Sequence, residues 1–161
     1  MLKRIKTSFV AFSLVELMVA VAILGMVGAV GMDSFNALSS KKNLKFEAEI
    51  VKKDMYVMQS RAVTGLKDQR FHIITNSSYQ LEEDLEGDGN WTIYQPERSF
   101  KPGVYFYGYS GKESKLEYKP SGLPEFNGAT SSPFFSLIYQ DTSEMKEFHI
   151  DSSGVVNIIT N

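Results

Sequence analysis

The sequence has 161 residues, a length that fits one domain with a hydrophobic core of its own. Hydrophobic residues make up 43% and aromatic residues 12%, so the chain carries enough apolar surface to offset the entropy lost on folding, and disorder throughout is excluded. The absence of cysteine excludes disulfides, thiolate metal sites and cysteine nucleophiles, and a formal net charge of −2 gives no strong attraction to nucleic acid or anionic lipid.

The chain begins with a short basic leader that is followed by a long apolar segment. The leader, residues 1–11, has no acid and three basic residues, Lys3, Arg4 and Lys6, whereas residues 12–32 carry one charged side chain, Glu16. A helix of that length can cross the roughly 30 Å hydrocarbon core of a bilayer, and a basic flank before it keeps the N-terminus in the cytoplasm. The sequence therefore predicts one membrane-spanning segment over residues 12–32.

A cleavable secretory signal is the alternative interpretation of this segment, with Ala29-Val30-Gly31 as its small-residue cleavage site. Glu16 counts against it, because an acid inside an apolar segment costs about 2.5 to 3.5 kcal/mol on insertion scales. Such a residue is rarely kept without a purpose. We therefore expect Glu16 to have a role that a secretory signal would not need.

The residues around Glu16 form a specific pattern. Ala11-Phe12-Ser13-Leu14-Val15-Glu16-Leu17, placed after a basic leader and opening an apolar helix, resembles the processing signal of type IV prepilins. The resemblance implies that a prepilin peptidase cuts between Ala11 and Phe12, that the new N-terminus at Phe12 is methylated, and that Glu16 serves subunit assembly. It also implies a bacterial inner-membrane protein, N-terminus cytoplasmic and head periplasmic, that later enters a fibre.

Two positions depart from the usual prepilin pattern. Ala11 stands where the family usually has Gly before the cut, and Asp33 stands where it often has Pro, so the usual helix kink is not expected at that position.

Gly25, Gly28 and Gly31 offer two further interpretations. Each costs a helix about 1 kcal/mol relative to Ala, which favours a bend, and their spacing of three equally suits a small-residue face for helix packing in lipid.

Beyond Asp33 the apolar residues follow the period of an amphipathic helix. They recur at alternating spacings of four and three: Leu44, Ala48, Val51, Met55, Met58 and Ala62. Five lysines are interleaved with them: Lys41, Lys42, Lys45, Lys52 and Lys53. No helix breaker occurs before Gly65, so we expect one helix from about Phe12 to about Val63, with its amphipathic half, residues 33–64, laid against a globular head. A free coiled coil is the alternative, although its seam would favour larger residues than alanine.

Helical periodicity ends near Gln69, and residues 65–161 have the pattern of a β-rich head. Short β-prone runs are separated by turn residues. The runs are Phe71–Thr75, Tyr79–Glu82, Trp91–Tyr94, Val104–Tyr109, Lys115–Lys119, Phe134–Gln140, Lys146–Asp151 and Val155–Ile159, with turns at 87–90, 102–103, 121–122 and 152–154. One helix followed by strands predicts an α+β fold, in which the long helix packs on an antiparallel β-sheet.

The C-terminal region narrows the resemblance. Leu116–Gly122, Phe135–Tyr139 and Phe148–Val156 are similar to the strand, turn and glycine order of the GspH/FimT group of minor pilins and pseudopilins. That group supplies subunits of type IV pili or of the type II secretion pseudopilus. The resemblance implies a structural subunit and not an enzyme, with other pilin subunits, prepilin peptidase and the inner-membrane assembly platform as partners.

Residues 84–90 form a candidate calcium loop. Asp84, Glu86, Asp88 and Asn90 alternate before or around glycines, close to the calcium-loop rule of helix-loop-helix proteins. The twelfth position is Gln95, which cannot supply a bidentate carboxylate, and the surrounding pattern is not helix-loop-helix. A polar hairpin turn is therefore the favoured interpretation, calcium is the alternative, and no other cofactor is expected.

Two other classes of function are disfavoured. His72 and His149 fall in separate predicted strands, without the spacing of a catalytic or metal-binding motif.

A competence-type pilin that binds extracellular DNA through a basic C-terminal segment is the rival function. Residues 155–161 contain no Lys or Arg, and loss of the leader would remove three of the 17 basic residues but none of the 19 acidic ones. Nucleic acid is therefore not expected as a partner.

Overall fold

The structure is a computed structural model that describes residues 13–107, 115–127, 135–140 and 144–161, with the backbone alone at 29–34 and 37. The predicted cleavage site, Ala11 and Phe12, lies outside the described residues. The chain divides into two compact units between Leu38 and Ser39.

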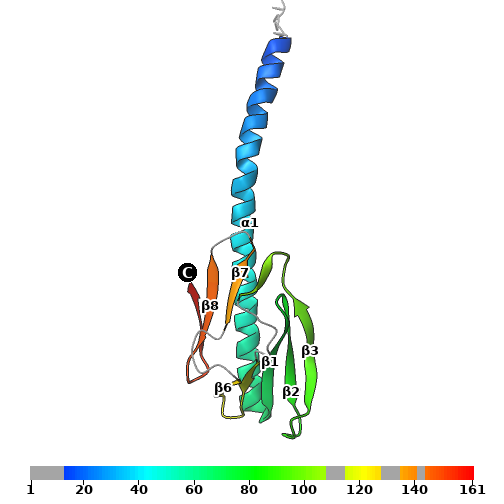
Figure 1. Ribbon diagram of the computed structural model, residues 1–161, viewed down its shortest axis with the longest axis vertical. Coiled ribbons are helices and arrows are strands. Elements are labelled where there is room, and N and C mark those ends of the chain that lie inside the picture. The colour runs from blue at the N-terminus through cyan, green and yellow to red at the C-terminus, as the bar shows by residue number, and fades with distance from the viewer. Residues whose placement is uncertain (1–12, 108–114, 128–134, 141–143) are drawn as a thin grey trace, which may run out of the picture. The chain divides into compact units, whose positions relative to one another are not determined.

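One helix, α1, runs from Leu14 to Gly65 (Figure 1), which confirms the single long helix expected from the sequence. It continues through Gly25 and Gly28, where an added Cβ atom would meet nothing within 4 Å. Neither glycine therefore ends the helix or packs against another described segment. The helix ends at Gly65, and Leu66 follows in the left-handed conformation, with φ at 53°, that commonly closes a helix C-terminus.

The strands follow α1 in sequence and pair antiparallel throughout, which confirms the α+β class. They are β1 (Asp68–Thr75), β2 (Ser78–Asp84), β3 (Trp91–Ser99), β4 (Val104–Tyr107), β5 (Lys115–Tyr118), β6 (Pro124–Asn127), β7 (Phe135–Tyr139), β8 (Met145–Ile150) and β9 (Val156–Thr160). Each predicted run overlaps one of these strands. The sequence pattern missed β6, which begins at Pro124 and lies at a sheet edge, where the missing N–H of proline is tolerated.

Within the predicted α+β class, the strands form two antiparallel sheets, a division that the sequence did not predict. The first has the order β3-β2-β1-β5-β6 and the second has the order β4-β7-β8-β9 (Figure 1). Gly103 directly precedes β4 of the second sheet; its φ of 88° turns the chain, and its carbonyl accepts a hydrogen bond from Gln140 N–H at 2.8 Å. A Cβ atom at Gly103 would lie 2.7 Å from the Tyr139 ring, so glycine is needed there. Strand propensity identifies strands but not their partners, so the division into two sheets could not be predicted.

The second half of α1 supplies one side of a core shared by both sheets. Leu44, Ala48, Val51, Met55, Met58 and Ala62 are each at most 1% exposed, which confirms the predicted apolar stripe. Aromatic rings from the two sheets meet over this stripe. The ring of Phe71 in β1 stacks on Phe135 in β7 with centroids 5.6 Å apart, and Phe135 meets Phe106 of β4 edge-on at 5.1 Å. The stripe therefore packs on sheets and not in a coiled coil.

A polar stripe runs beside the apolar one on α1 and binds β2 and β3. Its members, seven residues apart, are Glu47, Asp54 and Arg61. The Glu47 carboxylate contacts the Arg98 guanidinium at 3.1 Å, and Arg61 contacts Glu83 at 2.9 Å. Asp54 accepts a hydrogen bond of 2.6 Å from the Tyr79 hydroxyl. Burial, followed by this bond to Asp54, raises the pKa of Tyr79, so the hydroxyl keeps its proton and the bond.

Candidate functional site

The start of α1 carries a reciprocal pair of hydrogen bonds that involves Glu16. The Ser13 N–H donates to Glu16 Oε2 at 3.1 Å, and the Glu16 N–H donates to Ser13 Oγ at 3.1 Å. This is a capping box, in which both side chains satisfy backbone N–H groups that have no partner in the first turn of a helix. The Ser-Leu-Val-Glu spacing of the sequence encodes this box, so Glu16 caps the helix in addition to the assembly role that the resemblance implies.

The first part of α1 exposes apolar side chains on all of its sides. The residues that are more than half exposed are Leu14, Val15, Leu17, Met18, Val19, Val21, Ile23, Leu24, Met26 and Val27. A helix that is apolar all round is normally buried, either in protein or in lipid. Such an exposed surface on a soluble monomer would be unusual, so it indicates a partner outside this chain.

The structure leaves membrane insertion as a prediction. Among the residues that it describes, no helix has an apolar stretch long enough to cross a membrane. The predicted segment, residues 12–32, includes Phe12 and the side chains of 29–32, which lie outside the described part of the chain.

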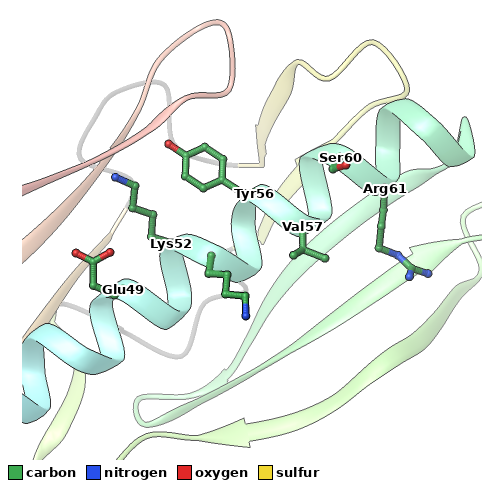
Figure 2. Close-up of a pocket in the computed structure, with 7 residues that line it drawn as sticks. Glu49, Lys52, Tyr56, Val57, Ser60 and Arg61 are labelled. Atoms are coloured by element: carbon green, nitrogen blue, oxygen red, sulfur yellow. The ribbon is translucent and has the colours of Figure 1, made fainter.

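A shallow hollow of about 410 Å³ lies on the second half of α1 (Figure 2). It is lined by Glu49, Lys52, Lys53, Tyr56, Val57, Ser60 and Arg61. Every lining residue belongs to α1. Tyr56 is also tied to β9, because its hydroxyl donates to the Val156 carbonyl oxygen at 3.3 Å. Arg61 at one end is engaged, because it pairs with Glu83 and its guanidinium lies over the Tyr94 ring at 4.2 Å from the centroid.

The candidate calcium loop is a turn held by its own backbone amides. Oδ1 of Asp84 accepts hydrogen bonds from the N–H groups of Glu86 at 3.3 Å and Gly87 at 2.8 Å, and Oδ2 accepts one from Gly89 at 2.8 Å. These hydrogen bonds lower the pKa of Asp84, and the bond from Gly89 has the largest effect. The Asp88 carboxylate likewise accepts hydrogen bonds from the backbone N–H of Asn90 at 2.9 Å and from Asn90 Nδ2 at 2.6 Å.

These contacts favour the hairpin-turn interpretation of residues 84–90. Both glycines have positive φ, at 72° and 85°, as tight turns require. In the described parts of the chain, no group of three or more His, Cys, Asp or Glu side chains is placed to hold a metal ion. Calcium binding by Asp84, Glu86, Asp88 and Asn90 remains a prediction.

The two histidines lie in different sheets, and each contacts a carboxylate. His72 Nδ1 in β1 is 2.9 Å from Oε1 of Glu82, and His149 Nε2 in β8 is 3.0 Å from Oε2 of Glu147. Glu82 also accepts hydrogen bonds of 2.5 Å from Arg70 Nε and from Gln80 Nε2. Burial alone would raise the pKa of Glu82, but the bonds from His72, Gln80 and Arg70 outweigh burial and lower it. This network joins β1 to β2, and no pattern in the sequence predicts it, because its members meet only when the two strands pair.

Comparison with solved structures identifies the fold. The minor pseudopilin EpsH from the type 2 secretion system of Vibrio cholerae is similar with a TM-score of 0.55 and 16% identity, over 73% of this chain and 96% of that chain. A second crystal structure of that pseudopilin gives 0.55 and 15%, over 74% and 94%. The type IV minor pilin FimU of Pseudomonas aeruginosa gives 0.55 and 12%, over 76% and 92%.

These similarities show that the chain has a pilin fold, as the sequence resemblance implied. The sequence matches no protein-family model, and no curated protein matches it significantly. At 12 to 16% identity the likeness establishes the fold alone, so function has to be argued from the site.

Proposed function

We propose that this chain is a structural subunit, a minor pilin or pseudopilin, of a type IV pilus or a type II secretion pseudopilus, and that it is not an enzyme. The observation that carries the proposal is the exposed apolar surface of α1 from Leu14 to Val27, joined in sequence to a head with the pilin fold. An apolar surface of this extent needs a partner. Lipid before assembly and neighbouring subunit helices after assembly provide one at each stage.

The proposal includes a defined maturation step. A prepilin peptidase removes residues 1–11, and the amine of Phe12 becomes the methylated N-terminus. Phe12 directly precedes Ser13, whose backbone N–H is bonded to Glu16. The new amine and the Glu16 carboxylate are therefore close in the sequence at the start of the apolar helix. The head stays in the periplasm, and the inner-membrane platform moves the subunit into the fibre.

The proposal is tested by expressing the full chain in a bacterium that has prepilin peptidase and makes such fibres. We expect a mature N-terminus at Phe12 by mass spectrometry, first in the inner-membrane fraction and then in sheared fibres. Ala11→Gly, which restores the usual family residue, should be processed at least as completely, whereas a charged residue in Ala11→Asp should block the cut. A mature start at Met32, or an intact Met1, would contradict the proposal.

A further inference from the structure

The side of α1 opposite its buried stripe presents a set of side chains that we name the basic face. Its members are Lys42, Lys45, Phe46, Glu49, Lys52, Lys53, Tyr56 and Val57. An α-helix has 3.6 residues per turn, so these positions gather on one side and the stripe from Leu44 to Ala62 lies on the other. All of them are exposed except Lys52, which is partly exposed.

The charges on the basic face are unbalanced. It holds four lysines and one acid, Glu49, and none of those four lysines forms an ion pair with any described residue. Lys41, the neighbour of Lys42, shows the contrast, because its ammonium lies 3.5 Å from Glu144. The fold therefore pairs the adjacent lysine with an acid and leaves the four lysines of the basic face without an acid partner among the described residues. Two cations lie over aromatic rings of this face, Lys52 at 5.8 Å from the Tyr56 centroid and Lys101 at 4.1 Å from the Phe46 centroid.

Apolar groups accompany these charges. Phe46 is 50% exposed, Tyr56 39% and Val57 40%. Tyr56 and Val57 line the hollow of about 410 Å³ in Figure 2, and Lys52 and Lys53 line it with them. A hollow with an apolar lining and cationic edges can receive a side chain from a second helix while its lysines meet acids on either side.

We propose that the basic face docks an acidic helix face of a different subunit in the same fibre. This proposal rests on the proposed function and adds to it the charge of the surface that the neighbouring subunit presents to α1. A second copy of this chain fits poorly, because it would bring four further lysines against these four with a single glutamate on each side. An anionic lipid surface would satisfy the lysines, but it would not use the hollow formed by Tyr56 and Val57.

The first test is cross-linking in cells. A photo-reactive residue at Val57 of the full chain should cross-link, in assembled fibres, to an α-helical peptide of another subunit, and mass spectrometry should show acids on the face of that peptide that is linked. A cross-link to a second copy of this chain, or to lipid, would overturn the proposal. A cross-link to a neighbour whose linked face lacks acids would overturn it as well.

The second test is charge reversal with rescue. Lys52→Glu combined with Lys53→Glu should leave the membrane level and N-terminal processing unchanged, since neither lysine forms an ion pair with a described residue, but should reduce fibre incorporation about tenfold. Acid-to-lysine changes in the linked peptide of the neighbour should restore it. Lys67→Glu, a basic residue beyond the end of α1, is the matched control and should incorporate normally.

The outcomes separate the two proposals. If the unchanged chain never enters fibres, the proposed function fails and the inference fails with it. If the unchanged chain and the double charge-reversal variant enter fibres equally well, the inference alone is wrong.

Discussion

Glu16 has one partner within its own helix, and we propose a second in a neighbouring subunit of the fibre. Within the chain it caps α1 by its bonds with Ser13, each 3.1 Å long. After processing, the amine of Phe12 would be largely cationic at neutral pH, since an α-amino group has a reference pKa near ~8. A carboxylate in apolar surroundings is stabilised by such an amine, and the resemblance to pilins implies that a neighbouring subunit supplies it.

The two roles of Glu16 can be separated by a pair of substitutions. Glutamine at this position of a capping box keeps the reciprocal bonds but removes the charge, whereas valine removes both. We expect Glu16→Gln and Glu16→Val to insert and be processed at least as well as the unchanged chain, because both remove a charge from an apolar segment. Both should enter fibres poorly, as measured by membrane level, N-terminal mass and content of sheared fibres.

Normal incorporation of Glu16→Gln beside poor incorporation of Glu16→Val would show that helix capping is the role that matters. Normal incorporation of both would leave Glu16 without a role in assembly.

Glu82 should make stability depend on pH at the acid end. Its pKa is lower in the folded chain than in the unfolded chain, because hydrogen bonds from His72, Gln80 and Arg70 outweigh the effect of burial. This stabilisation is therefore complete above the unfolded pKa and is lost as the pH falls through the folded pKa. Glu82→Gln should cost roughly 2 kcal/mol at pH 7 and flatten the fall in stability between about pH 5 and pH 3.

Urea unfolding over this pH range measures the effect of Glu82→Gln. Glu97→Gln, at an exposed position of β3, is the control and should leave the curve unchanged. If Glu82→Gln retained the full acid dependence, other carboxylates would have to account for it.

Gly154 is the point where the C-terminal hairpin meets α1. Its φ is 85°, and a Cβ atom there would lie 2.4 Å from Gln59 Nε2 and 2.8 Å from the Gly122 carbonyl oxygen. Gln59 Nε2 itself donates to the carbonyl oxygens of Gly122 at 3.1 Å and Ser153 at 3.0 Å, so one side chain holds a turn from each sheet.

Gly154→Ala should therefore destabilise the protein by roughly 2 to 4 kcal/mol, because strain at positive φ and displacement of Gln59 add together. Gly87→Ala has a similar φ of 72° with nothing within 4 Å of the new Cβ atom, so it should cost only about 1 kcal/mol. Thermal unfolding of the two variants compares them directly. Equal losses would mean that the contact with Gln59 contributes nothing.

At the scale of elements, the second half of α1 should be indispensable to the head. A chain that begins at Asp33 keeps the stripe from Leu44 to Ala62 and loses the exposed apolar surface, so it should fold as a soluble monomer. A chain that begins at Leu66 uncovers core residues such as Phe71, Leu81 and Leu116, which are 0% exposed in the intact fold, and should aggregate. Size-exclusion chromatography and urea unfolding report both outcomes, and equal stability of the two chains would contradict helix-on-sheet packing.

The periodicity of apolar residues predicted the helix and the strands, because each of these elements depends on residues that lie near one another in the chain. The four-three spacing from Leu44 to Ala62 identified the buried side of α1, and Gly103, Gly122 and Gly154 marked turns that the structure confirms by their positive φ. What could not be predicted depends on distant residues. The choice of β7 as the partner of β4, which creates the second sheet, rests on packing among Phe71, Phe106 and Phe135.

The candidate site also has one part that depends on nearby residues and could be predicted, and another part that depends on distant residues and could not. The prepilin-like pattern identified Glu16, and the Ser13 capping box could have been derived from the same four residues. The polar contacts of α1 with β2 and β3 could not be predicted from the sequence. Glu47, Asp54 and Arg61 contact partners that lie 22 or more residues further along the chain.

At the scale of the whole molecule, the distribution of charge argues against a DNA receptor. The C-terminal strand β9, Val156–Thr160, has no Lys or Arg, whereas four lysines without an ion pair to any described residue lie on the basic face of α1, which we assign to a subunit neighbour. A chain beginning at Asp33 should therefore bind DNA only weakly, within the range of about 10⁻⁴ to 10⁻⁶ M that is typical of non-specific contacts at physiological salt. Fluorescence titration with a labelled duplex measures this affinity, and repeating it at two salt concentrations gives the number of phosphate contacts. Lys52→Glu with Lys53→Glu should abolish whatever weak binding remains, because those contacts come from the basic face. Submicromolar affinity that survives this double substitution would place a DNA site elsewhere on the head and reverse the ranking of the two functions.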